Sequence, residues 1–301
     1  MSDQQTVTII GLGSMGFGAA TALLRAGFHV KGVDVRGAVL QAFADLGGEA
    51  FSTPAQAGPS DIVLVFVVNA AQTSEVLFGE NGALANARQG TVFVLCVTME
   101  PSSAIAIAAE LENAGMLVID APVSGGQQKA STGELTVMGS GAPQAFDKAE
   151  AALKAIATKI FQLDDKPGTG SKIKMINQLL AGIHIAATAE ALTLAARLGL
   201  DLGTVFDVIR VSAGASWMFE NRGPHIVEGD YAARSAVNIF VKDMGIVAAE
   251  AAALGASTPL SETALGLFRQ AAEAGLGLED DAAVAKILAS NSGVLLPGMG
   301  E

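Results

Sequence analysis

A glycine-rich turn near the start of the chain limits the possible folds more than any other segment. The sequence TVTIIGLGSMGFG puts an apolar run at 6–10 directly before the spacing G-x-G-x-x-G, and an alanine-rich helical pattern follows. Gly11 permits a tight turn, Gly13 lets a pyrophosphate approach the backbone, and Gly16 allows close packing of helix on strand. The strand–turn–helix context favours a dinucleotide-binding βαβ unit over a glycine turn without a ligand.

An acidic residue at the end of the second apolar run, Asp34, extends this pattern. In dinucleotide-binding folds such a residue binds the ribose hydroxyls, which favours NAD over NADP. Arg36 could instead accommodate a 2′-phosphate, so NADP stays possible, and an ordinary solvated charge is the equal alternative. The residues predicted to bind the cofactor here are Gly11, Leu12, Gly13, Ser14, Met15, Gly16, Asp34, Val35 and Arg36.

Short β-rich runs alternate with alanine-rich amphipathic segments through about the first 165 residues. This alternation is typical of a parallel sheet covered by helices. Half of the residues are hydrophobic but only 5% are aromatic, so Ala, Val, Leu and Ile must fill the core, as in α/β layers. The predicted strands are 6–10, 30–34, 61–67, 91–97, 117–123, 135–140 and 159–163.

After the Pro-Gly-Thr-Gly stretch in 164–170, strand-like runs almost disappear. We therefore predict an α/β chain with a Rossmann-type dinucleotide-binding domain at 1–165 and an all-α domain at 166–301 for substrate binding and oligomerisation. The predicted helices of the second domain are about 171–198, 203–212, 238–254, 259–274 and 281–288.

The charge and the cysteine content exclude several classes of protein. The net charge of −12 argues against a nucleic-acid surface and against binding to anionic membranes. One cysteine, Cys96, excludes a disulfide framework and favours a reducing compartment, so we expect a cytoplasmic protein. The N-terminal segment lacks the pattern of a signal peptide, and no run of 18 apolar residues occurs. No metal site is expected, because the three histidines are scattered: His29, His184 and His225.

The segment GTGSKIKMINQLL, residues 168–180, places three polar side chains on one helical face. Lys174, Asn177 and Gln178 lie at i, i+3 and i+4, whereas Lys172 points about 160° away from Lys174. The face continues through small and apolar residues, as a buried face would. A buried lysine needs an anion or a functional pKa, and the alternative is a lysine packed at a domain boundary.

Four motifs in order carry a resemblance that covers nearly the whole chain: IIGLGSMGFG, DAPVSGGQQKASTGELTVMGSG, GTGSKIKMINQLL and FVKDMGIV. With them the chain resembles the β-hydroxyacid dehydrogenase family, which includes 3-hydroxyisobutyrate dehydrogenase and tartronate semialdehyde reductase. The resemblance implies an N-terminal Rossmann-type domain, a long interdomain helix and an all-α C-terminal domain that often mediates homodimers or homotetramers. It also implies NAD-dependent oxidation of a small hydroxy acid.

The resemblance assigns a role to each candidate residue of the substrate site. Lys174 matches the catalytic lysine, which must have a lowered pKa to act as a general base. Most members carry Asn at the position of Gln178, so either Gln178 or Asn177 could contact the substrate. The turn after a predicted strand would hold the substrate carboxylate, with a simple glycine turn as the alternative: Ser124, Gly125 and Gly126.

Further cofactor contacts follow from the same resemblance. Thr98 matches a position at the nicotinamide ribose, although a turn hydroxyl is the alternative. Val68 and Asn69 occupy a loop after a strand that in many relatives contains proline. Lys242, in a Lys-Asp pair with Asp243, would lie near cofactor and substrate, unless the pair is merely solvated.

The segment 216–231, followed by IFVKDMGIV, is most similar to family members that oxidise L-threonate to 2-oxotetronate. The alternatives are 3-hydroxyisobutyrate or tartronate semialdehyde as substrate, imine reduction, and a non-catalytic NAD-binding module. Lys174 disfavours the last two, since relatives of those kinds have lost the lysine. Trp217, in the same segment, could line the pocket or simply pack in the core.

Overall fold

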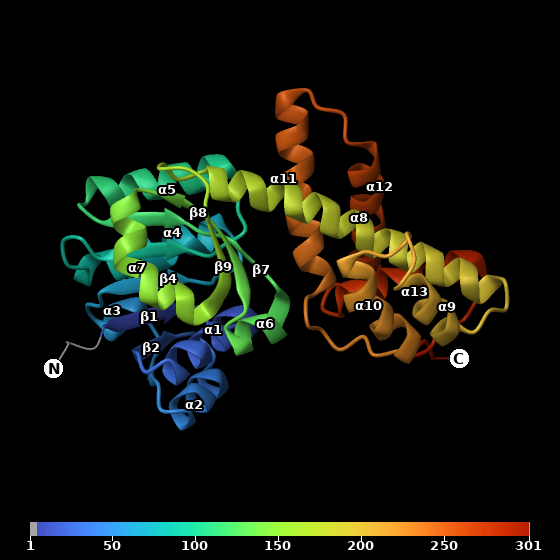
Figure 1. Cartoon of the computed structure of the whole chain (residues 1–301), viewed down its shortest axis with the longest axis horizontal. Helices are drawn as coiled ribbons and strands as arrows, with labels where there is room; N and C mark the ends of the chain where they lie inside the picture. The colour runs from blue at the N-terminus through green and yellow to red at the C-terminus, as the bar shows by residue number, and fades with distance from the viewer. Residues whose placement is uncertain (1–4, 301) are drawn as a thin grey trace. The chain divides into compact units, whose positions relative to one another are not determined.

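A computed structural model describes residues 5–300, which divide into two compact units (Figure 1). The N-terminal unit ends at Lys174 and the C-terminal unit begins at Met175. The first four residues of the predicted dinucleotide-binding domain, which also begin the segment examined for a signal peptide, lie outside the described residues, as does Glu301.

The N-terminal unit is built on one sheet in which, over the described residues, the strand order is β3-β2-β1-β4-β5-β6-β8-β7, and β9 pairs with β8. The first six strands of this order are parallel, β8 is antiparallel to β6 and β7, and β9 is parallel to β8. The order 3-2-1-4-5-6 is that of a doubly wound dinucleotide-binding fold. The strands are β1 (Thr6–Ile10), β2 (His29–Val33), β3 (Glu49–Phe51), β4 (Ile62–Val65), β5 (Val92–Leu95), β6 (Leu117–Asp120), β7 (Val123–Ser124), β8 (Leu135–Gly141) and β9 (Ala157–Gln162).

Helices cover both faces of this sheet because alternate residues of each buried strand point to opposite faces. One apolar layer joins the strands to α1, α2, α6 and α7, and the other joins them to α3, α4 and α5. The helices are α1 (Ser14–Arg25), α2 (Gly37–Asp45), α3 (Pro54–Ala57), α4 (Ala70–Phe78), α5 (Pro101–Asn113), α6 (Gly126–Thr132) and α7 (Pro143–Ile156), with a 3₁₀ turn at Ala83–Asn86.

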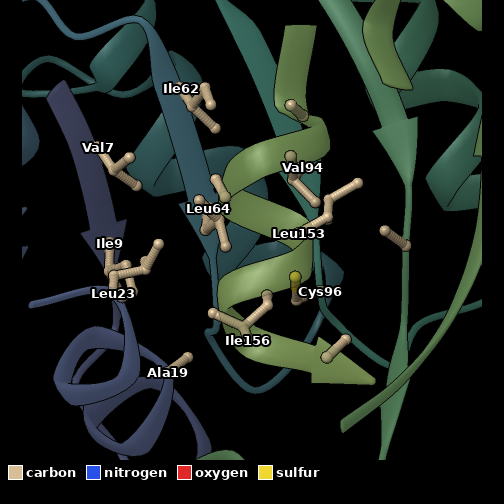
Figure 2. Close-up of a cluster of buried hydrophobic side chains, with 14 of the residues drawn as sticks. Val7, Ile9, Ala19, Leu23, Ile62, Leu64, Val94, Cys96, Leu153 and Ile156 are labelled. Atoms are coloured by element: carbon tan, nitrogen blue, oxygen red, sulfur yellow. The ribbon is translucent and has the colours of Figure 1, made fainter. Parts of the chain in front are cut away.

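Figure 2 shows the first of these layers, where side chains of β1, β4 and β5 face those of α1 and α7. Cys96 lies in it, and burial raises the pKa of its thiol far above the usual range. The labelled side chains are Val7, Ile9, Ala19, Leu23, Ile62, Leu64, Val94, Cys96, Leu153 and Ile156.

The C-terminal unit is helical and contains no strand in its described part, Met175 to residue 300. Its core contains apolar residues of α8, α10, α11, α12 and α13. The helices are α8 (Thr169–Arg197), which begins in the N-terminal unit, α9 (Leu202–Ile209), α10 (Trp217–Glu228), α11 (Val237–Leu254), α12 (Pro259–Ala271) and α13 (Val284–Ser292), with a π turn at Ala272–Leu276 and a 3₁₀ turn at Asp281–Ala283.

Among residues 5–300, α8 alone is long and apolar enough to cross a membrane by length and composition. It also contributes Ile185, Ala189 and Leu192 to the core of the C-terminal unit. A core helix of a folded protein passes the same test, so α8 gives weak evidence for a membrane span.

The predicted fold class is confirmed, with three local differences. Strand β3 was not predicted, because a three-residue strand leaves too short a pattern. The run predicted as one strand at 117–123 is divided into β6 and β7 around Pro122, which has no N–H for the sheet. Helix α10 was not predicted because Pro224 lies inside it.

Candidate active site

The glycine loop between β1 and α1 has a separate physical reason for each glycine. Gly11 has a φ of +94°, and a Cβ there would lie 2.7 Å from the carbonyl oxygen of Phe66. A Cβ on Gly16 would overlap the carbonyl oxygen of Gly11. A Cβ on Gly13 would meet no heavy atom within 4 Å. Gly11 and Gly16 are therefore required by the packing of the protein, whereas Gly13 keeps open space beside the loop.

This open space lies at the N-terminus of α1, where Gly13 is the N-cap and no side chain caps the helix. The first N–H groups of a helix have no partner within the helix, and together with the helix dipole they favour an anion. Ser14 and Met15, in the first turn, belong to this end of the helix. The loop thus fits the pyrophosphate of a dinucleotide.

Asp34, directly after β2, is buried and holds the glycine loop in place. Its Oδ2 accepts a hydrogen bond of 2.9 Å from the backbone N–H of Leu12. The backbone N–H of Arg36 donates to Oδ1 at 3.0 Å, and the Arg36 guanidinium donates to both oxygens at 2.8 Å. The hydrogen bond from the Arg36 side chain is the main reason that the pKa of Asp34 lies below its usual range. Val35, between them, is exposed.

The other predicted cofactor contacts of the N-terminal unit lie after β4 and β5, at the same carboxyl edge of the sheet as the glycine loop and Asp34. Val68 is exposed, and its N–H donates to Gln72 Oε1 at 2.9 Å. Asn69 caps α4, because its Oδ1 accepts from the backbone N–H of Gln72 at 2.9 Å. Thr98 is half-buried beyond the end of β5. Ligands of doubly wound folds bind at this edge.

The turn predicted to hold a carboxylate joins β7 to α6. Ser124 ends β7 and pairs with Thr136 of β8. Gly125 and Gly126 follow with φ values of +143° and +74°, which favour glycine at both positions. Gly125 is the N-cap of α6, so this turn also leads into a helix N-terminus.

The start of α8 is fixed by Asp120, a residue that the sequence analysis did not single out. Asp120 ends β6 with no exposed surface, and its Oδ2 accepts hydrogen bonds from the N–H groups of Gly168 (3.0 Å) and Ser171 (2.8 Å). Its Oδ1 accepts from Ser171 Oγ at 2.7 Å. A Cβ on Gly170 would collide with the backbone at Asp120 and Met138. Gly170 therefore has no room for a side chain, and Gly168 has a φ of +113°, which favours glycine.

Lys174 follows Ser171 by one helical turn on α8. It is buried, with 7% of its surface exposed, whereas Lys172 is exposed, as the helical geometry predicted. The structure thus separates the two lysines of the motif in the expected sense.

A chain of hydrogen bonds in the C-terminal unit fixes the amide of Gln178. Gln178 Nε2 donates to Asp243 Oδ2 of α11 at 2.5 Å, and Asn177 Nδ2 donates to Gln178 Oε1 at 2.9 Å. Lys242 Nζ lies 2.6 Å from Asp243 Oδ1, an ion pair by distance but without hydrogen-bond geometry. The sequence analysis named Asn177, Gln178, Lys242 and Asp243 but did not predict that Asp243 orients Gln178.

Two further predictions concern Trp217 and metal ions. Trp217 begins α10 and is 49% exposed, so it does not belong to the buried core. Across residues 5–300, no group of three or more His, Cys, Asp and Glu side chains could hold a metal ion.

Two family models together match most of the chain. Residues 6–163 match the NAD binding domain of 6-phosphogluconate dehydrogenase. Residues 168–288 match the NAD-binding domain of NADP-dependent 3-hydroxyisobutyrate dehydrogenase. The two matches meet in the segment that precedes α8.

Several known proteins are similar over almost their full length. The L-threonate dehydrogenase of Cupriavidus necator is 51% identical over 298 residues, which are 99% of both chains. That of Escherichia coli strain K12 is 48% identical over 97% of this chain and 96% of its own. The crystal structure of 3-hydroxyisobutyrate dehydrogenase from Salmonella typhimurium superposes with a TM-score of 0.91 at 46% identity, covering 94% of this chain and 100% of that one.

Proposed function

The chain belongs to the β-hydroxyacid dehydrogenase family, and on this basis we propose that it oxidises the 2-hydroxyl of L-threonate to 2-oxotetronate. Its membership makes it an NAD(P)-dependent hydroxyacid dehydrogenase. The observation that most supports L-threonate as the substrate is the 51% identity to an L-threonate dehydrogenase over 99% of both chains. The Gln178 amide, held by Asn177 and Asp243, supports the same substrate class.

The residues of the N-terminal unit suit NAD. The open side of Gly13 and the first N–H groups of α1 would take the pyrophosphate, and Asp34 the adenosine ribose. When bound, the nicotinamide supplies the acceptor for the hydride that leaves C2 of the substrate. Val68, Asn69, Thr98 and Lys242 are proposed as further contacts to the cofactor.

Lys174 is proposed as the general base that removes the proton of the 2-hydroxyl. Its amine is the only group on the polar face of α8, formed with Asn177 and Gln178, that can accept a proton. A positioned base of this kind contributes about 10²–10⁴-fold to the rate. The positioning of the substrate by the other side chains of the site must therefore provide the rest of the rate enhancement.

Ser124, with the N–H groups of Gly125 and Gly126, is proposed to hold the substrate carboxylate. An amide offers two N–H donors and an oxygen with two lone pairs. Gln178 gives one donor to Asp243 and one lone pair to Asn177, so one of each is left for a substrate hydroxyl. A polyhydroxy acid such as L-threonate can use such a mixed set, whereas the methyl group of 3-hydroxyisobutyrate cannot.

The test compares two lysines of one helix. Lys174→Ala should lower kcat on L-threonate by about 100-fold or more while NADH binding stays intact. Lys172→Ala, on the exposed side, should leave both unchanged. Near-normal turnover by Lys174→Ala would disprove the assignment of Lys174 as the general base.

A panel of hydroxy acids tests the substrate. L-Threonate, 3-hydroxyisobutyrate and tartronate semialdehyde are each assayed with NAD(H) and NADP(H) by absorbance at the reduced nicotinamide. L-Threonate should give the highest kcat/KM. A higher value for one of the other two acids would move the proposal to that acid, and NADH binding without any turnover would favour a non-catalytic module.

We also propose that the protein is a cytoplasmic homodimer or homotetramer. In the C-terminal unit α8 exposes Leu180, Leu194 and, just beyond its end, Leu198, each about half exposed or more. Exposed apolar stripes of this kind are often covered by a partner subunit. The cytoplasm is proposed because the chain has a single cysteine, Cys96, and so no disulfide framework. Light scattering after size exclusion, on wild type and Leu194→Glu, tests the assembly: a monomeric wild type would contradict it.

A further inference from the structure

The carboxylate of Asp34 is saturated with donors. A carboxylate has about four lone-pair positions. In this structure four hydrogen bonds reach them: the N–H groups of Leu12 and Arg36, and the Nε and Nη2 groups of the Arg36 side chain. The ribose hydroxyls of NAD need an acceptor at this residue, so the observed arrangement leaves no place for them.

We propose that the Arg36 side chain acts as a latch on Asp34 and sets the choice between NAD and NADP. The latch is closed while the guanidinium is hydrogen-bonded to Asp34, and it is open when the side chain has left. The proposal rests on the proposed cofactor role of Asp34. With the latch closed, the guanidinium occupies the positions on Asp34 that a ribose would use. NAD binding therefore requires the side chain of Arg36 to leave, and NADP binding gives the displaced side chain a phosphate to pair with.

The Arg36 side chain is able to leave without disturbing Asp34. It is 55% exposed, so water can replace the hydrogen bonds that it gives up, including one of 3.1 Å to the carbonyl of Leu12. Asp34, 7% exposed, keeps its two backbone donors, one on each oxygen. Each oxygen then has one position for a ribose hydroxyl, which matches the two hydroxyls of an adenosine ribose.

The latch predicts a lowered affinity for NAD. If the cofactor binds only the open form, the apparent affinity falls by the fraction of chains that are open. An ion pair with one exposed partner is weak, but bidentate geometry and the buried carboxylate strengthen this one. Removing the guanidinium should therefore tighten NADH binding by about 3- to 30-fold.

Removing the guanidinium of Arg36 should lower the affinity for NADPH. Without Arg36, the charge of Asp34 faces the 2′-phosphate with no cation in between, and the displaced side chain is no longer present to pair with it. Arg36→Gln should weaken NADPH binding by about tenfold or more. A rise in affinity for one cofactor with a fall for the other distinguishes a latch from general damage.

The experiment measures NADH and NADPH binding to the full chain by calorimetry, without any hydroxy acid. Arg36→Gln is compared with wild type and with Arg88→Gln, which removes an equal charge from an exposed loop before β5, at the opposite edge of the sheet. Tighter NADH with weaker NADPH in Arg36→Gln alone is the expected result. NADH binding that is weaker, or unchanged within twofold, would overturn the latch, because Arg36 would then contact NAD directly or leave Asp34 at no cost.

The measurement separates this inference from the proposed function. Binding is read without turnover, so an enzyme that oxidises no acid of the panel would refute the L-threonate proposal and leave the effect of Arg36 on the two cofactors measurable.

Discussion

Replacing Asp120 tests whether one buried carboxylate fixes the start of the helix that carries Lys174. In Asp120→Ala the N–H groups of Gly168 and Ser171 lose their acceptor in a site without water access. Each buried donor left unsatisfied costs about 1–3 kcal/mol, so we expect a loss of about 2–6 kcal/mol of stability. The hydroxyls of Ser140 and Ser171 also donate to Asp120, at 3.4 Å and 2.7 Å, and the loss of these two bonds adds to the cost.

Asp120→Asn should be much milder, because the structure divides the donors unequally between the two oxygens. Oδ2 accepts both backbone N–H groups, and Oδ1 accepts only the hydroxyl of Ser171. An asparagine with its oxygen at Oδ2 keeps both backbone bonds. Its NH₂ then donates to the Ser171 hydroxyl, which reverses its role. The expected loss is about 1 kcal/mol or less.

Urea unfolding followed by circular dichroism measures the stability, and kcat on the best hydroxy acid measures the effect on Lys174. A misplacement of about 1 Å can cost about 100-fold in rate, so Asp120→Ala should lower kcat by about tenfold or more. Asp164→Ala is the control, since this carboxylate also accepts a hydrogen bond from the start of α8, the hydroxyl of Thr169, but is exposed to water. Equal stability of the Ala and Asn variants of Asp120 would refute the reasoning.

The pH dependence gives an independent check on Asp120. Burial raises the pKa of this carboxyl above its usual value of 3.8. A raised pKa in the folded state means that the folded chain holds its proton more tightly than the unfolded chain, so the contribution of Asp120 to stability falls as the pH rises through the folded pKa. Asparagine does not titrate. The stability of Asp120→Asn relative to wild type should therefore improve as the pH rises from about 4 to neutral.

Three more perturbations follow from the structure. Gly13→Ala should keep wild-type stability within about 0.5 kcal/mol but weaken NADH binding. Gly16→Ala should lower the stability measured by urea unfolding by about 1–3 kcal/mol. Equal stability of the two variants would contradict the packing argument. Arg222→Ala, which leaves the fully buried Asp281 without its bidentate partner, should cost about 3–5 kcal/mol, and Arg222→Met with Asp281→Leu should cost less. Gln178→Asn should lower the kcat/KM ratio of L-threonate to 3-hydroxyisobutyrate by about tenfold or more, and an unchanged ratio would remove Gln178 from substrate choice.

The sequence predicted the parts of the fold that rest on long local patterns. The buried strands are continuous apolar runs, the glycine turn has a fixed G-x-G-x-x-G spacing, and α8 is a helical pattern of 29 residues. The prediction was wrong where tertiary contacts determine the secondary structure of a short segment. Strand β3 exists because it pairs with β2, and α10 continues past Pro224 with Arg222 bound to Asp281. Neither contact has a local signature.

The site was predictable in its residues but not in its connections. Asp34 and Arg36 were identified, yet only the backbone geometry after β2 turns the guanidinium back onto the carboxylate. Gln178 was recognised as a departure from the family pattern, but its partner, Asp243, lies 65 residues away. Pair contacts over such separations depend on how helices pack, and one sequence holds no record of that packing.

Asp34 and Asp120 play the same structural part, although the sequence analysis identified only Asp34. Each closes a buried strand, and each accepts a backbone N–H from the turn that begins a helix: Leu12 before α1, and Gly168 before α8. A buried carboxylate is costly unless it is satisfied in this way. Asp34 was recognised because it stands at a spacing known from dinucleotide binding. The physical signal, an acidic residue ending an apolar strand, is equally present at Asp120. An acidic residue at the end of an apolar strand therefore identifies both turns that position the proposed catalytic and cofactor-binding residues.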